Sequence, residues 1–394
     1  MNTFLQLAFD EAIRAIGISR PNPAVGAVVV RKNPSGKPVV IGMGHTQKPG
    51  EAHAEVMALK SAAAFDSQGA QGATIFVTLE PCCHYGRTPP CTKAIIDSGI
   101  KEVFYATPDA NPAVRGKSKK ILEDAGVAVY DTAEYAQEHN LASLAQLTAQ
   151  IRDFYFAYNY FVCNKKTFVH LKLAESADGF IAGVNGTPVA ITSENTNRIN
   201  HGWRAKSDAI LVSAQTLEKD NPSLTVRGVA GNNPIPFVLG NTRVLSPSLK
   251  IFNRIFCGEK NVWEHENFLP VVFSRVAQSA LDGSVDGVVR AKVVMLPSEF
   301  FEENWKFVVD YASQLGMHRL FVEPGAALCD KILQTCLFDR FDLWTSSKML
   351  GNGAPWNRNL LEHLKVCSCP MELCNEPPKG AVLDKLTVYE KVDI

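Results

Sequence analysis

Short apolar runs rich in β-branched residues alternate with helical patterns along most of this 394-residue chain. In the first part, residues 24–31, 73–79 and 102–107 have the composition of strands. Residues 53–64 and 116–126 have the apolar spacing of helices. Strands that alternate with helices favour a sheet covered by helices. The sequence therefore predicts an α/β protein.

A second alternating region follows. Its expected strands are residues 168–174, 208–213, 236–240, 269–274, 291–296 and 319–323, with helices at 193–205 and 299–316 and a closing strand in 383–394. A chain of this length exceeds the size at which one hydrophobic core usually keeps growing. We therefore predict two domains, residues 1–145 and 165–394, joined by a linker at residues 146–164.

The charges of the chain balance, because 40 Lys and Arg residues face 40 Asp and Glu residues. This gives no electrostatic reason to bind nucleic acid or an anionic membrane. The amino-terminal segment carries Asp10 and Glu11 in an amphipathic pattern, which is not a secretion signal, and no apolar run approaches the ~18 residues of a membrane span. We expect a soluble cytoplasmic protein with a small-molecule substrate; whether it forms a homo-oligomer stays open.

Three side chains with metal-binding chemistry, His53, Cys82 and Cys91, accompany a carboxylate at Glu55. A catalytic zinc site typically has three protein ligands and a water that the metal makes acidic. Glu55 is suited to move a proton from that water to a leaving amine. His-x-Glu followed by Pro-Cys and a further Cys is typical of zinc-dependent base deaminases. We therefore expect one Zn²⁺ on His53, Cys82 and Cys91, with Glu55 as the catalytic residue.

The same residue types also occur in proteins that hold no catalytic zinc. A His-x-Glu pair is often a surface feature, and a cysteine is often a buried thiol. A structural zinc would need a fourth ligand, for which Cys83 is available, but adjacent residues rarely reach one metal together. Pro81 favours a helix start at Cys82, where the helix N-terminus would stabilise a thiolate. A second zinc at a later cysteine group is a weaker alternative, because no His or fourth Cys is close; its members are Cys367, Cys369 and Cys374.

Residues 20–116 resemble the deaminase half of the bacterial bifunctional riboflavin-biosynthesis family of diaminohydroxyphosphoribosylaminopyrimidine deaminase/5-amino-6-(5-phosphoribosylamino)uracil reductases. The matching runs are RPNPAVGAVV (20–29), GHTQKPGEAHAEV (44–56), TLEPCCHYGRTPPC (78–91) and DANPAVRGKS (109–118). The resemblance implies a cytidine-deaminase-like three-layer domain with the zinc ligands and proton donor named above. It also implies substrate contacts from Asn22, His45, His84, Arg87 and Asn111.

The second half is less specific by itself. Gly325 follows an expected strand and precedes a helix, where backbone N–H groups can hold a phosphate. The same family continues with a dihydrofolate-reductase-like domain, whose landmarks occur here in order as LKLAESADG (171–179), ITS (191–193), residues 204–227, VEPGAAL (322–328) and KMLGNG (348–353). The resemblance implies NADPH beside Ala174, Thr216, Asp220, Gly325, Ala326, Ala327 and Leu328. It places substrate beside Lys172, Arg204, Leu224, Arg227 and Glu323.

Five positions depart from the pattern of this family: Pro188 replaces a small polar residue, Ala190 a Trp, Asn221 and Gly240 an Asp each, and Pro324 a Gly. The expected function is still two steps of riboflavin synthesis. Zinc-bound hydroxide deaminates 2,5-diamino-6-ribosylamino-4(3H)-pyrimidinone 5′-phosphate, and NADPH then reduces the ribosyl group of 5-amino-6-(5-phosphoribosylamino)uracil. The main alternative is a monofunctional deaminase with an inactive ligand-binding or assembly domain. A nucleic-acid base deaminase and a non-enzymatic zinc protein are further alternatives.

Overall fold

The computed structural model describes residues 1–65, 67–240, 243–253, 269–367 and 384–391. The chain forms two compact units. One contains residues 1–166 together with 230–232, and the other contains residues 167–229 and 233–394. Residues 146–164, which the sequence suggested as a linker, are helical and group with the first unit. Both units combine helices with a sheet, as the sequence predicted.

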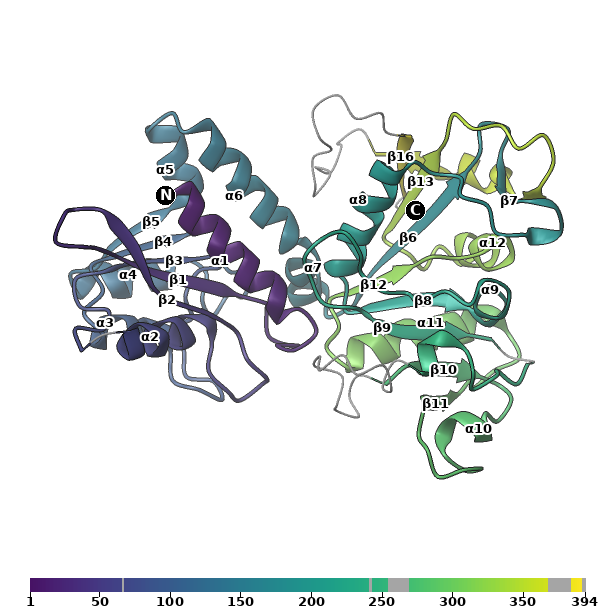
Figure 1. Ribbon diagram of the computed structural model, residues 1–394, viewed down its shortest axis with the longest axis horizontal. Coiled ribbons are helices and arrows are strands. Elements are labelled where there is room, and N and C mark those ends of the chain that lie inside the picture. Colours follow the sequence, from purple (N-terminus) through teal and green to yellow (C-terminus); the bar gives the residue numbers. More distant parts are fainter. Residues whose placement is uncertain (66, 241–242, 254–268, 368–383, 392–394) are drawn as a thin grey trace. The chain divides into compact units, whose positions relative to one another are not determined.

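The first unit is built on a five-stranded sheet with strand order β2-β1-β3-β4-β5 (Figure 1). The strands are β1 (Gly26–Lys32), β2 (Pro38–His45), β3 (Thr74–Val77), β4 (Glu102–Tyr105) and β5 (Ala128–Asp131). β1 pairs antiparallel with β2 and with β3, whereas β3, β4 and β5 are parallel. The carboxyl ends of β2, β3 and β4 therefore lie at the same edge of the sheet as the amino end of β1.

Helices cover both faces of this sheet and make a three-layer unit (Figure 1). They are α1 (Asn2–Ala15), α2 (Ala54–Phe65), α3 (Cys91–Asp97), α4 (Lys117–Asp124), α5 (Thr132–Glu138), α6 (Ala142–Phe154) and α7 (Phe156–Asn164). α2 and α3 lie on one face and α1, α5 and α6 on the other. Gly26 lets α1 approach β1 closely, because a side chain there would overlap the backbone of α1. Gly42 and Gly44 do the same for α2 on β2.

The second unit contains a nine-stranded sheet with order β11-β10-β9-β8-β12-β6-β13-β16-β15. Its strands are β6 (Phe168–Glu175), β8 (Ala209–Ser213), β9 (Ile235–Leu239), β10 (Val271–Ser274), β11 (Lys292–Met295), β12 (Arg319–Val322), β13 (Arg340–Thr345), β15 (Leu364–Val366) and β16 (Lys385–Lys391). The described strands of this sheet run in one direction except β16, which pairs antiparallel with β13 and with β15. A small separate sheet pairs β7 (Phe180–Ala182) with β14 (Ala354–Pro355).

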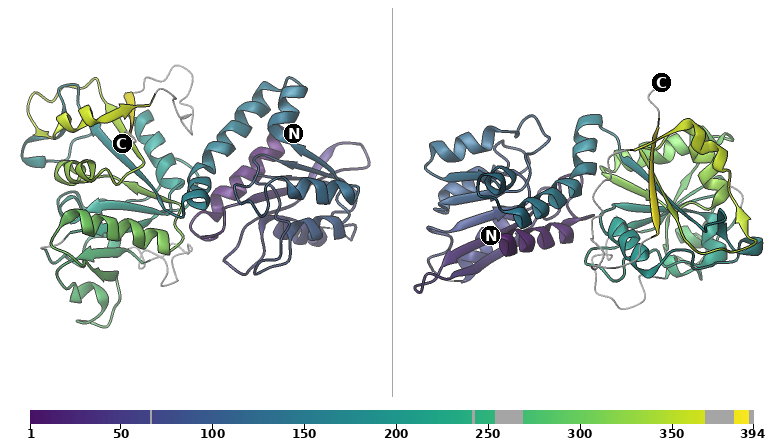
Figure 2. Two further views of the ribbon diagram at one scale, coloured as in Figure 1. Left: turned by 180° about the vertical axis from the view of Figure 1, so that it is seen from behind. Right: turned by 90° about the horizontal axis from the view of Figure 1, so that it is seen from above.

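Helices cover both faces of the large sheet (Figure 2), and a hydrophobic cluster lies on each face. Trp203 of α8 (Glu194–Ala205) and Leu217 of α9 (Ala214–Asp220) pack on one face. Trp305 of α11 (Phe301–Gln314) and Ile332 of α12 (Ala326–Thr335) pack on the other. The remaining described helices are α10 (Ser279–Asp282) and three 3₁₀ turns at Val184–Gly186, Lys250–Phe252 and Arg358–His363.

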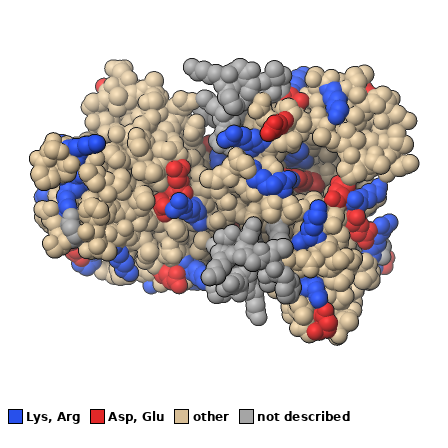
Figure 3. Space-filling view, viewed as in Figure 1, with Lys and Arg blue, Asp and Glu red and all other residues tan. Residues whose placement is uncertain are grey.

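Charges of both signs are mixed on the surface. On the face drawn in Figure 3, the Lys and Arg side chains of each unit are interspersed with Asp and Glu side chains, in keeping with the balanced counts in the sequence. Within the described part of the chain, no helix combines the length and apolarity needed to cross a membrane.

Candidate active sites

Four chain segments meet at one edge of the first sheet. His45 ends β2 and is the strand partner of Gly26 at the start of β1. Thr78, just after β3, donates its backbone N–H to the Gly26 carbonyl at 3.1 Å. Glu80 of the same loop donates its N–H to the carbonyl of Thr107, which follows β4, at 2.9 Å. Ligands of open α/β sheets bind at the carboxyl ends of strands, so this edge is the place to look for a site.

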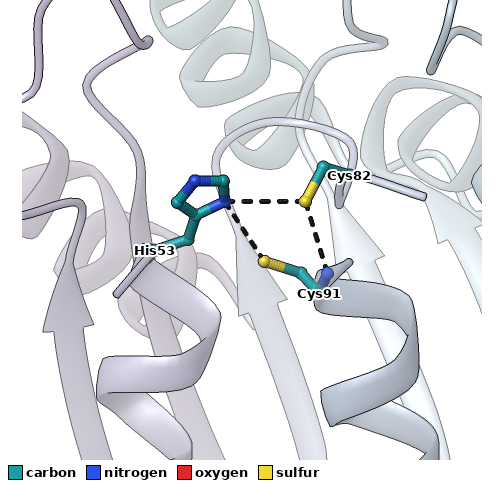
Figure 4. A group of neighbouring side chains, drawn as sticks. All are labelled: His53, Cys82 and Cys91. Atoms are coloured by element: carbon teal, nitrogen blue, oxygen red, sulfur yellow. Dashed lines mark hydrogen bonds between the residues drawn. The ribbon is translucent and has the colours of Figure 1, made fainter. Parts of the chain in front are cut away.

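The expected metal ligands come together at this edge (Figure 4). His53 directly precedes α2, Cys82 lies in the loop after β3, and Cys91 is the first residue of α3. His53 Nδ1 is 3.5 Å from Cys82 Sγ and 3.4 Å from Cys91 Sγ. One ligand atom from each residue lies within 4.8 Å of the other two. The structure therefore forms a three-ligand cluster from residues that are far apart in the sequence.

The helix in this loop begins later than the sequence suggested. A start at Cys82 was expected after Pro81, but the helix starts at Cys91 with Pro90 as its N-cap. The prediction of a helix start at Cys82 was wrong, because residues 82–90 form a loop. The first N–H of the helix still stabilises a sulfur, since the Cys91 backbone N–H donates to Cys82 Sγ at 3.3 Å.

Hydrogen bonds divide the protons unequally between the two thiols. The Cys91 thiol donates to Cys82, which together with the His53 contact lowers the pKa of Cys82 to about 4 despite its burial. The same hydrogen bond and burial raise the pKa of Cys91. Cys82 and Cys91 would both hold a zinc ion as thiolates, so zinc binding would release the proton that remains on Cys91.

Glu55 is the second residue of α2, and only 3% of its surface is exposed. Burial, reinforced by the negative charge of Cys82, raises the pKa of its carboxyl group to about 7. A carboxyl group in this range can accept and return a proton near neutral pH. The neighbouring thiol of Cys83 lies outside the cluster and donates to the carbonyl of Ala113 at 3.6 Å.

The five expected substrate contacts occupy loops and strand ends. Asn22 lies in a turn in which its N–H bonds the carbonyl of Ser19. His45 ends β2, and its Nδ1 contacts Glu11 of α1. His84 and Arg87 are exposed in the loop between Cys82 and Cys91, and Asn111 follows β4 with its side chain accepting the Ala113 N–H at 3.0 Å. The structure thus places these residues on segments that begin or end at the same sheet edge.

Sequence reasoning missed the buried groups that hold this edge together. Glu80 is 3% exposed and accepts the backbone N–H groups of Gly116 at 2.9 Å and Asp109 at 3.3 Å. Because Glu80 precedes Cys82 by two residues, it ties the metal loop to the loop that carries Asn111. The signal was an acidic residue directly before the Pro-Cys pair.

The second unit brings three of its expected substrate residues together. Arg204 at the end of α8 forms a two-pronged ion pair with Glu323, which follows β12; both N–O distances are 2.7 Å. Burial alone would raise the pKa of Glu323, but Arg204 brings it down to about 2. Lys172 of β6 is close enough to interact with both charges, and burial lowers its pKa.

Leu224 and Arg227 lie in the following loop. Leu224 is buried with a φ of 52°, a conformation that is uncommon for a bulky side chain and often marks a functional turn. The guanidinium group of Arg227 donates to the hydroxyls of Ser223 at 2.8 Å and Thr225 at 3.0 Å. The backbone N–H of Arg227 donates to His201 of α8. The loop is thereby anchored to the helix that carries Arg204.

The expected cofactor residues lie on three elements. Gly325 is the N-cap of α12, and Ala326, Ala327 and Leu328 form the first turn of that helix. A Cβ atom on Gly325 would be 3.2 Å from Thr216 Oγ1, so this turn approaches α9. Ala174 is half-buried on β6, and Asp220 is exposed at the end of α9. The structure joins Gly325 with Thr216 and leaves Asp220 at the surface.

Two departures from the family pattern have structural explanations. Asn221 caps α9 with a φ of 40°, which Asn tolerates, and its side chain accepts the N–H of Lys250 at 2.8 Å. Gly240 follows β9, where a side chain would overlap the Cβ atom of Ala214.

The three remaining departures from the family pattern are Ala190, Pro188 and Pro324. Ala190 is exposed, and its carbonyl accepts a hydrogen bond from Lys348 at 2.9 Å. Nothing in the structure explains Pro188 or Pro324.

In the second cysteine group, the backbone N–H of Cys367 donates to a carbonyl of β16, whereas Cys369 and Cys374 lie outside the described residues.

Comparisons with known proteins agree with both units. The model of the cytidine and deoxycytidylate deaminase zinc-binding region matches residues 1–107, and the model of the RibD C-terminal domain matches residues 167–365. The Riboflavin biosynthesis protein RibD of Aquifex aeolicus is 33% identical over 92% of each chain. That of Bacillus amyloliquefaciens is 32% identical over 88% of this chain and 85% of its own.

Solved structures resemble the chain over nearly its whole length. A diaminohydroxyphosphoribosylaminopyrimidine deaminase/5-amino-6-(5-phosphoribosylamino)uracil reductase from Thermotoga maritima is 27% identical, with a TM-score of 0.66 over 99% of this chain and 98% of its own. RibD of Acinetobacter baumannii gives a TM-score of 0.65 at 27% identity over 100% of this chain and 99% of its own. These matches and the family models confirm the expected fold class.

Proposed function

The chain belongs to the family of riboflavin biosynthesis proteins RibD, and we propose that its two units catalyse two successive reactions on one phosphoribosyl pyrimidine. It is a bifunctional enzyme of riboflavin biosynthesis, with a zinc-binding deaminase domain followed by a reductase domain. We propose the substrates, the cofactor and the roles of the residues from the geometry of the two sites.

The observation that carries the deaminase proposal is the cluster of His53, Cys82 and Cys91 beside buried Glu55. Tetrahedral zinc with Zn–N and Zn–S bonds of ordinary length separates neighbouring ligand atoms by about 3.6 Å. The distances of 3.4 Å and 3.5 Å from His53 Nδ1 to the two sulfurs fit this value. Zn²⁺ bound there would acidify a water molecule and leave one position open for it.

The protein supplies the proton transfers and holds the substrate. Glu55 accepts the proton of the water and delivers it to the departing 2-amino group, so that ammonia leaves 2,5-diamino-6-ribosylamino-4(3H)-pyrimidinone 5′-phosphate. Asn22 and Asn111 offer amide groups to the ring, and His84 and Arg87 offer donors suited to the phosphate. The burial of Glu55 keeps its proton exchange near neutral pH.

The deaminase proposal is tested by ammonia release from this substrate. We expect release by the zinc-loaded protein, loss of release after treatment with a chelator, and recovery on adding Zn²⁺. A protein that holds one zinc per chain and releases no ammonia would make the zinc purely structural.

We further propose that the second unit uses NADPH to reduce the ribosyl group of 5-amino-6-(5-phosphoribosylamino)uracil. The amino end of α12 at Gly325 is suited to a cofactor phosphate, and Thr216 lies against this turn. Lys172 and the Arg204–Glu323 pair form a charged group on neighbouring elements. The cofactor supplies hydride, and the side chains position substrate and cofactor for the transfer.

NADPH oxidation with the deaminated substrate tests this second activity. Because Ala190 replaces the expected Trp, we expect the enzyme to work with a raised KM for NADPH rather than a lowered kcat. Arg227→Ala and Lys172→Ala should reduce oxidation. No oxidation at any NADPH concentration, by a protein with a folded second unit, would favour the monofunctional deaminase.

A further inference from the structure

The buried carboxylate of Glu11 contacts His45, one of the proposed substrate-binding residues. Glu11 of α1 and His45 at the end of β2 are joined by Glu11 Oε2 and His45 Nδ1 at 2.8 Å. The Glu11 side chain is 8% exposed and that of His45 is 26% exposed. The contact depends on Gly26, the strand partner of His45, since a side chain at Gly26 would overlap α1.

The segment that leads to Cys82 begins beside this pair of residues. The N–H of Gly26 donates to the hydroxyl of Thr78 at 3.1 Å, and Thr78 begins the segment that leads to Cys82. His45, Gly26 and Thr78 therefore lie side by side across β2, β1 and the end of β3. His45 therefore ends β2 at the same edge of the sheet as the loop that carries Cys82, and its side chain is partly exposed there.

The pair determines which atom of His45 is free. A carboxylate only accepts hydrogen bonds, so His45 Nδ1 must carry a proton when it contacts Glu11. Arg14 keeps the carboxylate charged from its other side, with Arg14 Nη1 and Glu11 Oε1 at 2.7 Å. In the neutral ring, Nε2 is then an acceptor and lies on the side of the ring away from Glu11.

We infer that Glu11 is a positioning residue that fixes His45 in the Nδ1–H form, so that Nε2 accepts a hydrogen bond from an N–H or O–H group of the deaminase substrate. The inference rests on the proposed deaminase function. His45 Nε2 would then bind a hydrogen-bond donor of the substrate. The amino groups of an aminopyrimidine and the hydroxyls of a ribose are such donors, whereas an ionised phosphate is not.

Kinetics of deamination distinguish positioning from mere support of the fold. Glu11→Leu should raise KM for the pyrimidine about tenfold and change kcat less, because the lost contact acts on the bound substrate throughout the reaction. Glu11→Gln, whose amide oxygen can still accept from Nδ1–H, should stay within about threefold of the unmodified enzyme. Asp10→Asn is the matched control on the exposed side of α1 and should have no effect.

A double variant tests whether Glu11 acts through His45. His45→Ala should raise KM, and Glu11→Leu added to His45→Ala should raise it no further. Additive effects, or an unchanged KM in Glu11→Leu, would overturn the inference. Absence of deamination by the unmodified zinc-loaded protein would instead overturn the proposed function.

The form of the His45 ring is measurable without any activity. In protein labelled with ¹⁵N-histidine, the signals lost in His45→Ala identify this residue among the nine histidines. At pH 8 these signals should report a proton on Nδ1 in the unmodified protein and in Glu11→Gln, and a shift towards Nε2–H in Glu11→Leu. The Nε2–H form in the unmodified protein would contradict the assigned orientation.

Discussion

Replacing Arg204 by Ala should destabilise the second unit, because it leaves Glu323 charged and largely buried. The paired side chains are 14% and 19% exposed, and the two N–O distances are 2.7 Å. The pKa of Glu323 is about 2, against an ordinary value of 4.5. At about 1.4 kcal/mol per pKa unit this difference corresponds to ~3.5 kcal/mol of folding free energy. Since Lys172 remains nearby, we expect Arg204→Ala to cost about 2–3 kcal/mol at pH 7.

The effect should depend on pH in a defined direction. A depressed carboxyl pKa contributes its full stabilisation above the unfolded pKa and loses it as pH falls towards the folded pKa. For Glu323 the stabilisation is therefore lost as the pH falls from about 4.5 to about 2. The difference in unfolding free energy between the unmodified protein and Arg204→Ala should therefore be largest near pH 7 and narrow by at least about 1 kcal/mol at pH 3.5, because burial without Arg204 raises the pKa of Glu323 in the variant.

Tryptophan fluorescence during urea unfolding is a suitable assay, because all five Trp residues follow residue 166 and report on the second unit alone. Arg243→Ala is the matched control. Arg243 pairs with Glu218 at 2.6 Å but is 61% exposed, so its removal should cost at most about 1 kcal/mol. Equal losses for Arg204→Ala and Arg243→Ala, or a difference that does not change with pH, would refute the reasoning.

Further variants test other parts of the structure. Cys91→Ser should lower the zinc content measured by metal analysis, whereas Cys83→Ser should leave it unchanged. The reverse result would make Cys83, and not Cys91, the zinc ligand. Glu80→Ala removes the acceptor for two backbone N–H groups and should destabilise the first unit by about 2 kcal/mol in chelator-treated protein followed by circular dichroism; an unchanged midpoint would count against this role. Gly240→Asp should cost about 1–3 kcal/mol by tryptophan fluorescence, partly recovered by adding Ala214→Gly; a stable Gly240→Asp would show that the close contact relaxes freely.

Much of the fold could be predicted because the apolar periodicity of most elements is clear. The strand expected at residues 168–174 is β6, and the helix expected at 193–205 is α8. β13 was missed because it carries Arg340 and Asp342 in a strand with neighbours on both sides. Those charges are buried together and satisfied by each other and by His170, which a linear pattern does not reveal.

β2 was missed for a different reason. Gly42 and Gly44 lower the strand propensity of residues 38–45, yet both are required where α2 packs directly on the backbone. A strand whose identity depends on a helix pressed against it cannot be recognised from its own residues. The same limit applies to Glu11, whose partner is 34 positions away and across a strand pair.

The proximity of the three proposed zinc ligands was the part of the site most easily predicted, because the chemistry of zinc restricts its ligands to a few residue types. The geometry brings together His53, Cys82 and Cys91, as the pattern suggested. The second unit was less predictable. Its charged cluster is assembled from the ends of separate elements, and only the resemblance connected Arg204 with Glu323.

Two single variants in one pair of assays test most directly whether the two units act as independent catalytic sites. Glu55→Gln should keep its zinc, release no ammonia from the diaminopyrimidine substrate, and still oxidise NADPH with the deaminated substrate. Lys172→Ala should release ammonia at the rate of the unmodified protein and oxidise little NADPH. If Glu55→Gln loses zinc, or if either variant loses both activities while folded, the account of two separate sites is contradicted.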